Sequence, residues 1–336
     1  ATELPRISED GLVYTIPLRQ GVFFHDGNSF NASAMEFAIQ RFIKNGGRPS
    51  FLLSDLVSSV KATGEYELEI TLKKPFSAFP ALLTFPGLSA ISPQAYEIGE
   101  GKFKPDSFVG TGPYKLAKYR QDSLVLEAFK DYWGEKSVNQ EVGLQLLSSP
   151  VNLFNSFRTK AVDVAYLSLD PDQINNLEAG VKQGKFQRIE GTSNTVSYMV
   201  LNLKSQPLDN LKVRQAIALM IDRSLINNRA LRGQAQPLYS LIPTTFTEVY
   251  KPVFKTEYGD GKFSQAKDLL KQAGFSTENP AKLQLWYPTG STRRSLVAMT
   301  LKALAQKYLE GVLKVEINTI EAATLYQNLE KGIYPA

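Results

Sequence analysis

Cysteine is absent from the 336-residue sequence, and histidine occurs once, at His25. The missing cysteines exclude disulfides, thiol nucleophiles and thiolate metal sites. One histidine cannot supply a metal site with several imidazole ligands, and a Ser-His-Asp triad would have to use it. Because His25 precedes the tight-turn dipeptide Asp26-Gly27, a structural or partly exposed role is expected rather than a catalytic one. No run of eighteen apolar residues occurs, so no membrane-spanning helix is predicted.

The sequence also lacks a strong charge of either sign. Lys and Arg number 38 and Asp and Glu 33, which gives a net charge of +5. A basic chain can bind nucleic acid, but these residues are scattered, and the adjacent pairs are Lys73-Lys74 and Arg293-Arg294. Since no basic stretch carries interleaved aromatic residues, we expect no nucleic-acid binding.

A glycine-rich phosphate loop is missing as well. The segment GTGPYKL contains G-x-G but has neither a third glycine nor a following helix, so it fails the dinucleotide and P-loop patterns. We interpret Gly110, Gly112 and Pro113 as a turn between domains. No pair of carboxylates is spaced in a way that indicates acid–base catalysis.

Strand and helix patterns are clear in the first part of the chain. Residues 12–18 alternate as a strand, and Asn31 is placed to cap a helix with apolar residues at helical spacing. The stretch EYELEITL at 65–72 predicts a half-buried antiparallel strand. An apolar stretch interrupted by Pro80 and Pro86 indicates a short helix and a loop packed on a sheet.

The middle of the chain predicts further elements of both kinds. They are strands at 123–129 and 142–147 and helices at 152–159 and 171–183. The segment VSYMVLNL at 196–203 is apolar on both faces. It therefore predicts a strand that is buried on both sides or crosses between domains.

The C-terminal third follows a βαβ pattern. In order, it predicts a helix at 264–273, a strand at 282–288, a helix at 293–309, a strand at 313–320 and a helix at 322–331. This order implies a parallel sheet with a right-handed crossover. The sequence stops shortly after Gly332, where the next strand should begin, so we expect the chain to be a fragment.

The stretch PLDNLKVRQAIALMIDRSLI at 207–226 surrounds an apolar helical stripe with charges. Asp209 or Asn210 can cap the start of this helix, and Asp222 can cap a second one that Gly233 would end. Charged residues beside an apolar stripe usually face solvent. We therefore interpret the cluster as a framework rather than as a site.

A candidate site lies between the predicted strand at 282–288 and the next helix. The connecting loop is at the carboxyl end of a parallel strand, where open α/β sheets bind ligands. The helix start offers backbone N–H groups and the hydroxyls of Ser291 and Thr292. Arg293 and Arg294 add two guanidinium groups, and the combination suits an anion such as a carboxylate. The alternative is an ordinary helix start with two solvated arginines.

Motifs in the sequence resemble one known family. In chain order they are EDGLVYTIPLRQGVFFHDGNSFNASAMEFAIQR, GTGPYKL, DYWG at 131–134, NLKSQPLDNLKVRQAIALMIDRSLI and AKDLLKQAGF. They resemble landmarks of the family 5 extracellular solute-binding proteins, the peptide- and nickel-type receptors of ABC importers. In that family the fourth motif belongs to the scaffold, in agreement with the framework interpretation.

The resemblance implies an α/β, periplasmic-binding-protein-like fold of two lobes around a cleft, with an extra small α+β domain. Carried over, residues 1–110 form the small domain, 111–194 the middle segment of the first lobe and 195–336 most of the second lobe. Family members continue beyond the matching part on both sides. The fold is therefore expected to be incomplete at both termini.

The function implied is that of a non-enzymatic receptor without a cofactor. It would capture a solute in the interlobe cleft, close over it and deliver it to the permease subunits of an ABC importer. A short peptide is the expected ligand, and a nickel complex or another solute is the alternative. The family also implies a periplasmic or extracellular location, with or without a lipid anchor, and a monomeric full-length protein. Outside the family, the alternatives are a hydrolase that uses His25 and a nucleic-acid-binding protein.

Five residues are the candidate ligand contacts. Thr195, Tyr198 and Val200 match cleft positions on the family's hinge strand. Arg293 matches a position that can meet a ligand carboxylate, and Tyr287 lies on the strand before it. The resemblance implies neither catalytic nor metal-binding residues.

Overall fold

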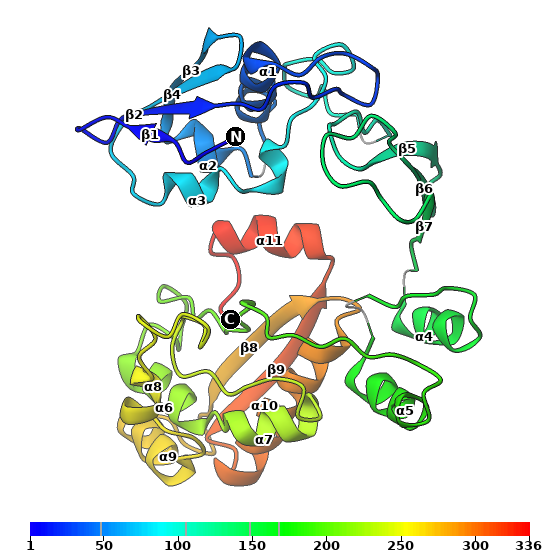
Figure 1. Cartoon of the computed structure of the whole chain (residues 1–336). Helices are drawn as coiled ribbons and strands as arrows, with labels where there is room; N and C mark the ends of the chain where they lie inside the picture. Colours follow the sequence, from blue (N-terminus) through cyan, green and yellow to red (C-terminus); the bar gives the residue numbers. More distant parts are fainter. Residues whose placement is uncertain (48, 105, 148, 167–168) are drawn as a thin grey trace. The chain divides into compact units, whose positions relative to one another are not determined.

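The computed structural model describes residues 1–47, 49–104, 106–147, 149–166 and 169–336. It divides into two compact units, Ala1–Ser148 and Ser149–Ala336, each of which contains helices and sheets (Figure 1). The α/β class predicted from the sequence is confirmed. The finer domain boundaries at residues 110 and 194 stay predictions. Within the described residues, no helix has the length and apolar character that a membrane crossing needs.

The first unit begins with a four-stranded antiparallel sheet in the order β1-β2-β4-β3. Its strands are β1 (Arg6–Ile7), β2 (Val13–Pro17), β3 (Val57–Gly64) and β4 (Glu67–Leu72). Helix α1 (Ala32–Lys44) contacts β3 and β4. Short helical turns follow at α2 (Phe51–Ser54), α3 (Phe79–Leu82) and η1 (Pro86–Leu88).

Alternation of apolar and polar residues explains why β4 could be predicted from the sequence and why β3 could not. Leu68, Ile70 and Leu72 of β4 are at most 2% exposed and form one apolar face, as the sequence predicts. Strand β3 was not predicted. A register shift between Val57 and Ser59 interrupts its alternation, because a bulge places two residues opposite one.

A second antiparallel sheet completes the first unit, with the strands β5 (Tyr114–Tyr119), β6 (Ser123–Ala128) and β7 (Glu141–Gln145) in that order. The strands predicted at 123–129 and 142–147 are thus confirmed. Every strand residue of this sheet remains at least partly exposed. Tyr119 is 46% and Leu144 42% exposed, so this sheet contributes little to a core.

The second unit combines helices with a parallel pair of strands, β8 (Ala281–Pro288) and β9 (Leu313–Ile320), joined by α10 (Thr292–Tyr308). The predicted βαβ pattern is confirmed. The other helices are α4 (Pro150–Arg158), α5 (Pro171–Lys182), α6 (Leu211–Met220), α7 (Arg223–Ala230), α8 (Val253–Glu257), α9 (Phe263–Gln272) and α11 (Ala322–Glu330).

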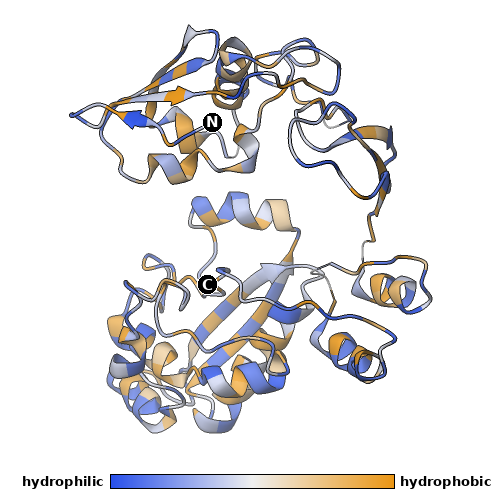
Figure 2. Ribbon diagram, viewed as in Figure 1, coloured by the Kyte–Doolittle hydropathy of each residue, from blue (hydrophilic) through white to orange (hydrophobic). Residues whose placement is uncertain are grey.

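The core of the second unit is built on the apolar stripe of α6. Val213, Ala216, Ile217 and Met220 are at most 1% exposed and pack with apolar residues of α9, α10, β8 and β9. In Figure 2, the helices and strands of this unit each carry both hydrophobic and hydrophilic residues. The predicted stripe therefore organises the core that supports the parallel strands.

The prediction of a doubly buried strand at 196–203 is wrong. This segment belongs to no strand in the described structure. Met199 and Leu201 pack against the core, whereas Tyr198 is 71% and Val200 46% exposed. Apolar composition alone does not make a strand, since a strand needs a ladder of backbone hydrogen bonds with a neighbour. The segment instead presents one apolar side to solvent.

Candidate ligand-binding site

The carboxyl ends of β8 and β9 lie side by side. The two strands pair in register up to Pro288 and Ile320. Directly beyond them, the backbone N–H of Thr289 donates to the carbonyl of Ile320 at 2.8 Å. Gly290 has a φ of +82°, a left-handed conformation that glycine adopts without strain. The loop before α10 therefore turns at the sheet edge where open α/β sheets bind ligands.

The start of α10 has no side-chain cap. Ser291 occupies the N-cap position, but its hydroxyl makes no capping hydrogen bond. The N–H groups of the first helical turn have no partner within the helix, so they and the helix dipole can stabilise an anion. The binding of a ligand at this loop stays a prediction.

The neighbouring helix start, at α11, differs from that of α10. The carboxylate of Glu321 accepts hydrogen bonds from the backbone N–H groups of Ala323 and Thr324, both at 2.9 Å. These bonds hold the pKa of Glu321 below its usual value. The carboxylate of Glu321 thus occupies the N-terminus of α11. Of the two helix starts, α10 and α11, the one open to an external anion is that of α10.

Two cations flank the open helix start. Arg293 and Arg294 are exposed, and neither has an ion-pair partner among the described residues. Guanidinium groups bind carboxylates through paired, charge-assisted hydrogen bonds. An anion at this loop would therefore meet both a helix start and positive charge.

Tyr287, also a candidate contact, is positioned differently. Its partly buried side chain packs against the core of the second unit. The adjacent Trp286 points to the other face of β8, because side chains alternate along a strand. Tyr287 therefore lies closer to the hydrophobic core than the arginines do.

The remaining candidates lie along the irregular segment before α6. Thr195 is exposed, and its hydroxyl accepts a hydrogen bond from Ser193 at 2.8 Å. Tyr198 and Val200 are exposed apolar side chains. Among the described residues, no hydrogen bond or ion pair joins these three candidates to Arg293. The structure thus offers two separate groups of candidates within the second unit.

Trp286 is a further feature that sequence reasoning missed. Its ring stacks on Tyr334 with centroids 4.6 Å apart. Its indole N–H is buried and has no hydrogen-bond partner in the part of the chain that the structure describes. Strand alternation could have separated Trp286 from the core-facing Leu285, but no pattern in the sequence indicates the stacking with Tyr334.

A second missed feature is the segment 240–249, LIPTTFTEV preceded by a serine. Leu241, Phe246 and Val249 are 68%, 49% and 57% exposed. The hydroxyl of Thr245 donates to the side-chain oxygen of Asn194 at 2.5 Å. This bond brings an exposed apolar segment next to the residue that precedes Thr195.

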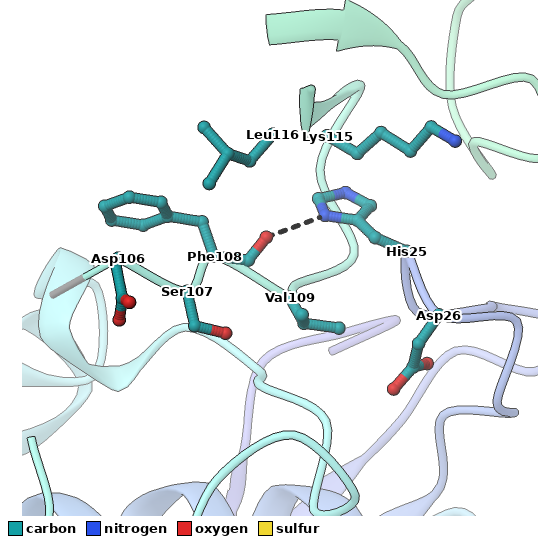
Figure 3. Close-up of a pocket in the computed structure, with 8 residues that line it drawn as sticks. All are labelled: His25, Asp26, Asp106, Ser107, Phe108, Val109, Lys115 and Leu116. Atoms are coloured by element: carbon teal, nitrogen blue, oxygen red, sulfur yellow. Dashed lines mark hydrogen bonds between the residues drawn. The ribbon is translucent and has the colours of Figure 1, made fainter. Parts of the chain in front are cut away.

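His25 lies beside a cavity of about 310 Å³ in the first unit (Figure 3). Its Nε2 is 3.0 Å from the carbonyl of Gly112, and its Nδ1 is 3.3 Å from the backbone N of Gly110. With hydrogen on Nε2, the ring donates to the carbonyl of Gly112 and accepts from the N–H of Gly110. With hydrogen on Nδ1, the ring donates to the carbonyl of Phe108 at 3.4 Å, the contact drawn in Figure 3. The edge of the ring packs on Phe129 at a centroid distance of 5.0 Å. These contacts give His25 a structural role at the predicted turn.

The neighbouring carboxylate also serves the structure. Asp26 accepts a hydrogen bond from the hydroxyl of the fully buried Ser92 at 2.5 Å. Burial alone would raise the pKa of Asp26, but hydrogen bonds from Ser92 and Asn28 outweigh it and hold the pKa below its usual value. The site therefore does not assemble the hydrogen-bonded Ser-His-Asp chain that a triad requires. Across the described residues, no group of three or more His, Asp and Glu side chains is placed to hold a metal ion.

Comparison with known proteins places this fold in context. Residues 1–336 match the sequence model of the family described as "Bacterial extracellular solute-binding proteins, family 5 Middle". The chain is 32% identical to the glutathione-binding protein GsiB of Pectobacterium atrosepticum over 97% of this chain and 62% of that protein. The same figure of 32% holds for GsiB of Escherichia coli K12, over 94% of this chain and 60% of the relative. The chain thus spans about three fifths of the length of these relatives.

Solved structures agree with the sequence matches. Haemophilus influenzae OppA in complex with the peptide RPPGFSPFR has a TM-score of 0.78 at 24% identity, over 98% of this chain and 68% of OppA. Brucella suis NikA in complex with Fe(III)-EDTA has a TM-score of 0.79 at 22% identity, over 99% of this chain and 68% of NikA. Helicobacter pylori DppA in complex with the peptide STSA has a TM-score of 0.76 at 24% identity, over 98% and 66% of the two chains.

These likenesses define the class first: the fold is that of periplasmic binding proteins. The chain belongs to the family 5 bacterial extracellular solute-binding proteins. The resemblance drawn from the sequence motifs is confirmed. The candidate contacts Thr195, Tyr198, Val200, Tyr287 and Arg293 stay predictions.

Proposed function

We propose that the protein is the solute-binding receptor of an ABC-type importer and that its ligand is a short peptide with a free carboxylate. Family membership supports the receptor role. A glutathione-binding relative and peptide-bound OppA and DppA support a peptide ligand. The observation that carries the ligand assignment is the uncapped start of α10 beside Arg293.

The proposed role of Arg293 follows from charge and position. Its side chain is exposed at the carboxyl end of β8 and has no ion-pair partner among the described residues. A ligand carboxylate at the α10 start would receive backbone N–H groups and the guanidinium group together. Thr195, Tyr198, Val200 and Tyr287 would meet the rest of the ligand.

The mechanism proposed is closure without chemistry. Ligand that binds one conformation more tightly shifts the population toward it, and the permease recognises that state. The partners in this mechanism are the ligand and the membrane permease. The proposal also includes a periplasmic or extracellular location and a monomeric full-length protein. A lipid anchor would be compatible with this role.

A metal complex is the second candidate ligand. NikA of Brucella suis was solved with Fe(III)-EDTA, and its fold matches that of this chain. Since no ligand cluster for a bare metal ion occurs among the described residues, a metal would have to arrive inside an anionic chelate. The carboxylates of such a chelate could use the same α10 start and Arg293.

The receptor proposal is tested by titration calorimetry of the full-length protein, because the 336-residue chain spans only about three fifths of the length of its relatives. The probes are trialanine, trialanine with an amidated C-terminus, reduced glutathione and the nickel–histidine complex. We expect trialanine to bind about tenfold or more tightly than its amide, since the amide lacks the charge that strengthens the hydrogen bonds. Equal affinities for acid and amide would contradict the carboxylate assignment, and a preference for the nickel complex would favour the second candidate.

A further inference from the structure

The Asp-Arg pair that follows α6 holds more than the start of α7. Besides its place in the helix, Arg223 reaches across to Asp260, with Nη1 2.8 Å from Oδ1. The same Nη1 donates to the carbonyl of Gly259 at 3.1 Å, and Nε donates to the carbonyl of Leu238 at 2.9 Å. Both charged side chains are about four fifths buried, at 17% and 21% exposure. One guanidinium thus joins the start of α7 to two separate loops.

Tyr239 closes this network. Its hydroxyl donates to the second carboxylate oxygen of Asp260, and its ring lies over the guanidinium of Arg223 with 4.9 Å from Cζ to the ring centroid. The carbonyl of Tyr239 accepts a hydrogen bond from the backbone N–H of Phe254 at 3.0 Å. Residues 238 and 239 are therefore fixed by side-chain and backbone bonds together. A partly buried ion pair whose hydrogen bonds are all satisfied holds its residues in one arrangement. The reason is that charge-assisted hydrogen bonds are strong and directional away from water.

The fixed residues lead directly into the exposed apolar segment 240–249. Leu241, Phe246 and Val249 of this segment remain exposed, so hydrophobic burial does not hold it in place. The middle of the segment is bonded to Asn194 through the hydroxyl of Thr245. The segment is thus held by polar contacts at its start and in its middle, while its apolar side chains stay available.

We propose that Arg223, Asp260 and Tyr239 form a positioning clamp that holds residues 240–249 against Asn194 as an apolar wall of the ligand site. This inference rests on the proposed function, and it specifies the ligand further as a peptide with an apolar side chain. The three residues are positioning residues, since they act through the segment and not on the ligand. We assign the ligand as the occupant because the segment is bonded to Asn194, and the next residue, Thr195, is a proposed ligand contact.

The test separates the clamp from the ligand. Tyr239→Phe removes the hydroxyl that reaches Asp260 and keeps the ring over Arg223, so the fold is retained. Tyr258→Phe is the matched control, because Tyr258 lies in the same region and its hydroxyl makes no hydrogen bond among the described residues. Amide hydrogen exchange of residues 238–249 is measured first, without ligand. We expect at least tenfold faster exchange in Tyr239→Phe than in the control, with unchanged exchange in α6 and α9.

Binding is measured next in the full-length protein, with trialanine and alanyl-leucyl-alanine as probes. We expect the wild-type chain to prefer the leucyl peptide by about tenfold or more, since burial of a leucine side chain is worth that much. Tyr239→Phe should reduce this preference several-fold, and Arg223→Lys should reduce it as well, because an ammonium cannot reproduce the forked contacts.

The outcomes identify which statement is wrong. Unchanged exchange in Tyr239→Phe would overturn the clamp, whatever the affinities are. Faster exchange with an unchanged preference for the leucyl peptide would overturn the apolar wall and leave the receptor proposal standing. If the full-length wild-type protein bound neither peptide while its exchange pattern matched the expectation, the proposed peptide ligand would be wrong, and the proposed selection by the wall would be wrong with it.

Discussion

The side-chain amide of Asn202 donates to the carbonyl oxygens of Gly332 at 2.9 Å and Tyr334 at 3.3 Å. Its backbone N–H donates to the carbonyl of Pro335 at 2.8 Å. One asparagine therefore fastens the irregular segment before α6 to the residues that follow α11. The amide gives two donors in one plane, which explains why an asparagine suits this position.

Replacement of Asn202 by alanine should destabilise the second unit by about 1–3 kcal/mol, because each of the two lost hydrogen bonds contributes about 0.5–1.5 kcal/mol. The Asn202→Asp change would not preserve these bonds, since an ionised carboxylate cannot donate to carbonyls. Urea unfolding of Asn202→Ala checks the value, with the exposed neighbour Lys204→Ala as control. Equal unfolding free energies for Asn202→Ala and the control would show that the amide contacts contribute nothing.

In the full-length protein, Arg293→Ala should weaken the binding of a carboxylate-bearing peptide by about ten- to a hundredfold. The reason is the loss of a charge-assisted hydrogen bond worth about 1.5–3 kcal/mol at the uncapped start of α10. The matched control is Lys314→Ala, which removes one exposed positive charge at the opposite end of the parallel strands. Calorimetry with trialanine that gave the same affinity for Arg293→Ala and the control would refute the anion site.

Asp222→Ala should behave in the opposite way. Asp222 caps α7, where its Oδ1 accepts a hydrogen bond from the backbone N–H of Leu225 at 2.8 Å. Loss of such a cap costs about 1 kcal/mol of stability. We expect a lower urea midpoint and an unchanged affinity for trialanine. A large loss of affinity at unchanged stability would place Asp222 in the ligand site and overturn its role as a framework residue.

Local patterns explain why so much of the fold could be predicted. Asn31 and Asp222 were identified as caps because a short polar side chain before an apolar stripe has one favourable use, and both caps are present. Of the two residues offered for the start of α6, Asn210 makes the bond. Strand β9 lies at 313–320 as predicted, since alternation and flanking helices agree there.

Contacts between distant residues explain what could not be predicted. The segment 196–203 has the composition of a strand, but whether it pairs depends on which residues lie beside it, and only the fold decides that. The same holds for the candidate site. Arg293 could be found because loop, strand and helix are consecutive, whereas the bond between Thr245 and Asn194 joins residues 51 positions apart.

The network of Arg223, Tyr239 and Asp260 predicts a stability difference that depends on pH. Burial alone would raise the pKa of Asp260, but hydrogen bonds from Tyr239 and Arg223 outweigh it and hold the pKa below its usual value. The bond to Asp260 raises the pKa of Tyr239 above its usual value. The other charged groups that face the phenol are Asp222 and Lys255, the latter with its Nζ 5.7 Å from the ring centroid.

Whether a group stabilises the fold at a given pH depends on whether the folded or the unfolded state binds its proton more tightly. A carboxylate with a lowered pKa stabilises the fold above the ordinary value of about 4, and this contribution is lost as pH falls through the folded pKa. A phenol with a raised pKa stabilises the fold below the ordinary value of about 10, and this contribution is lost as pH rises through the folded pKa. The network should therefore contribute fully only between about pH 4 and 10.

Urea unfolding of the wild type and Tyr239→Phe at pH 3, 7 and 11 measures this window, because the difference between them cancels groups that both chains share. We expect the wild type to be more stable than the variant at pH 7, and the difference to shrink at pH 3 and at pH 11. The Tyr258→Phe control is measured at the same three values, to show what the loss of a tyrosine hydroxyl without the bond to Asp260 does. A Tyr239→Phe difference that stayed constant from pH 3 to 11 would show that the bond to Asp260 does not couple to protonation.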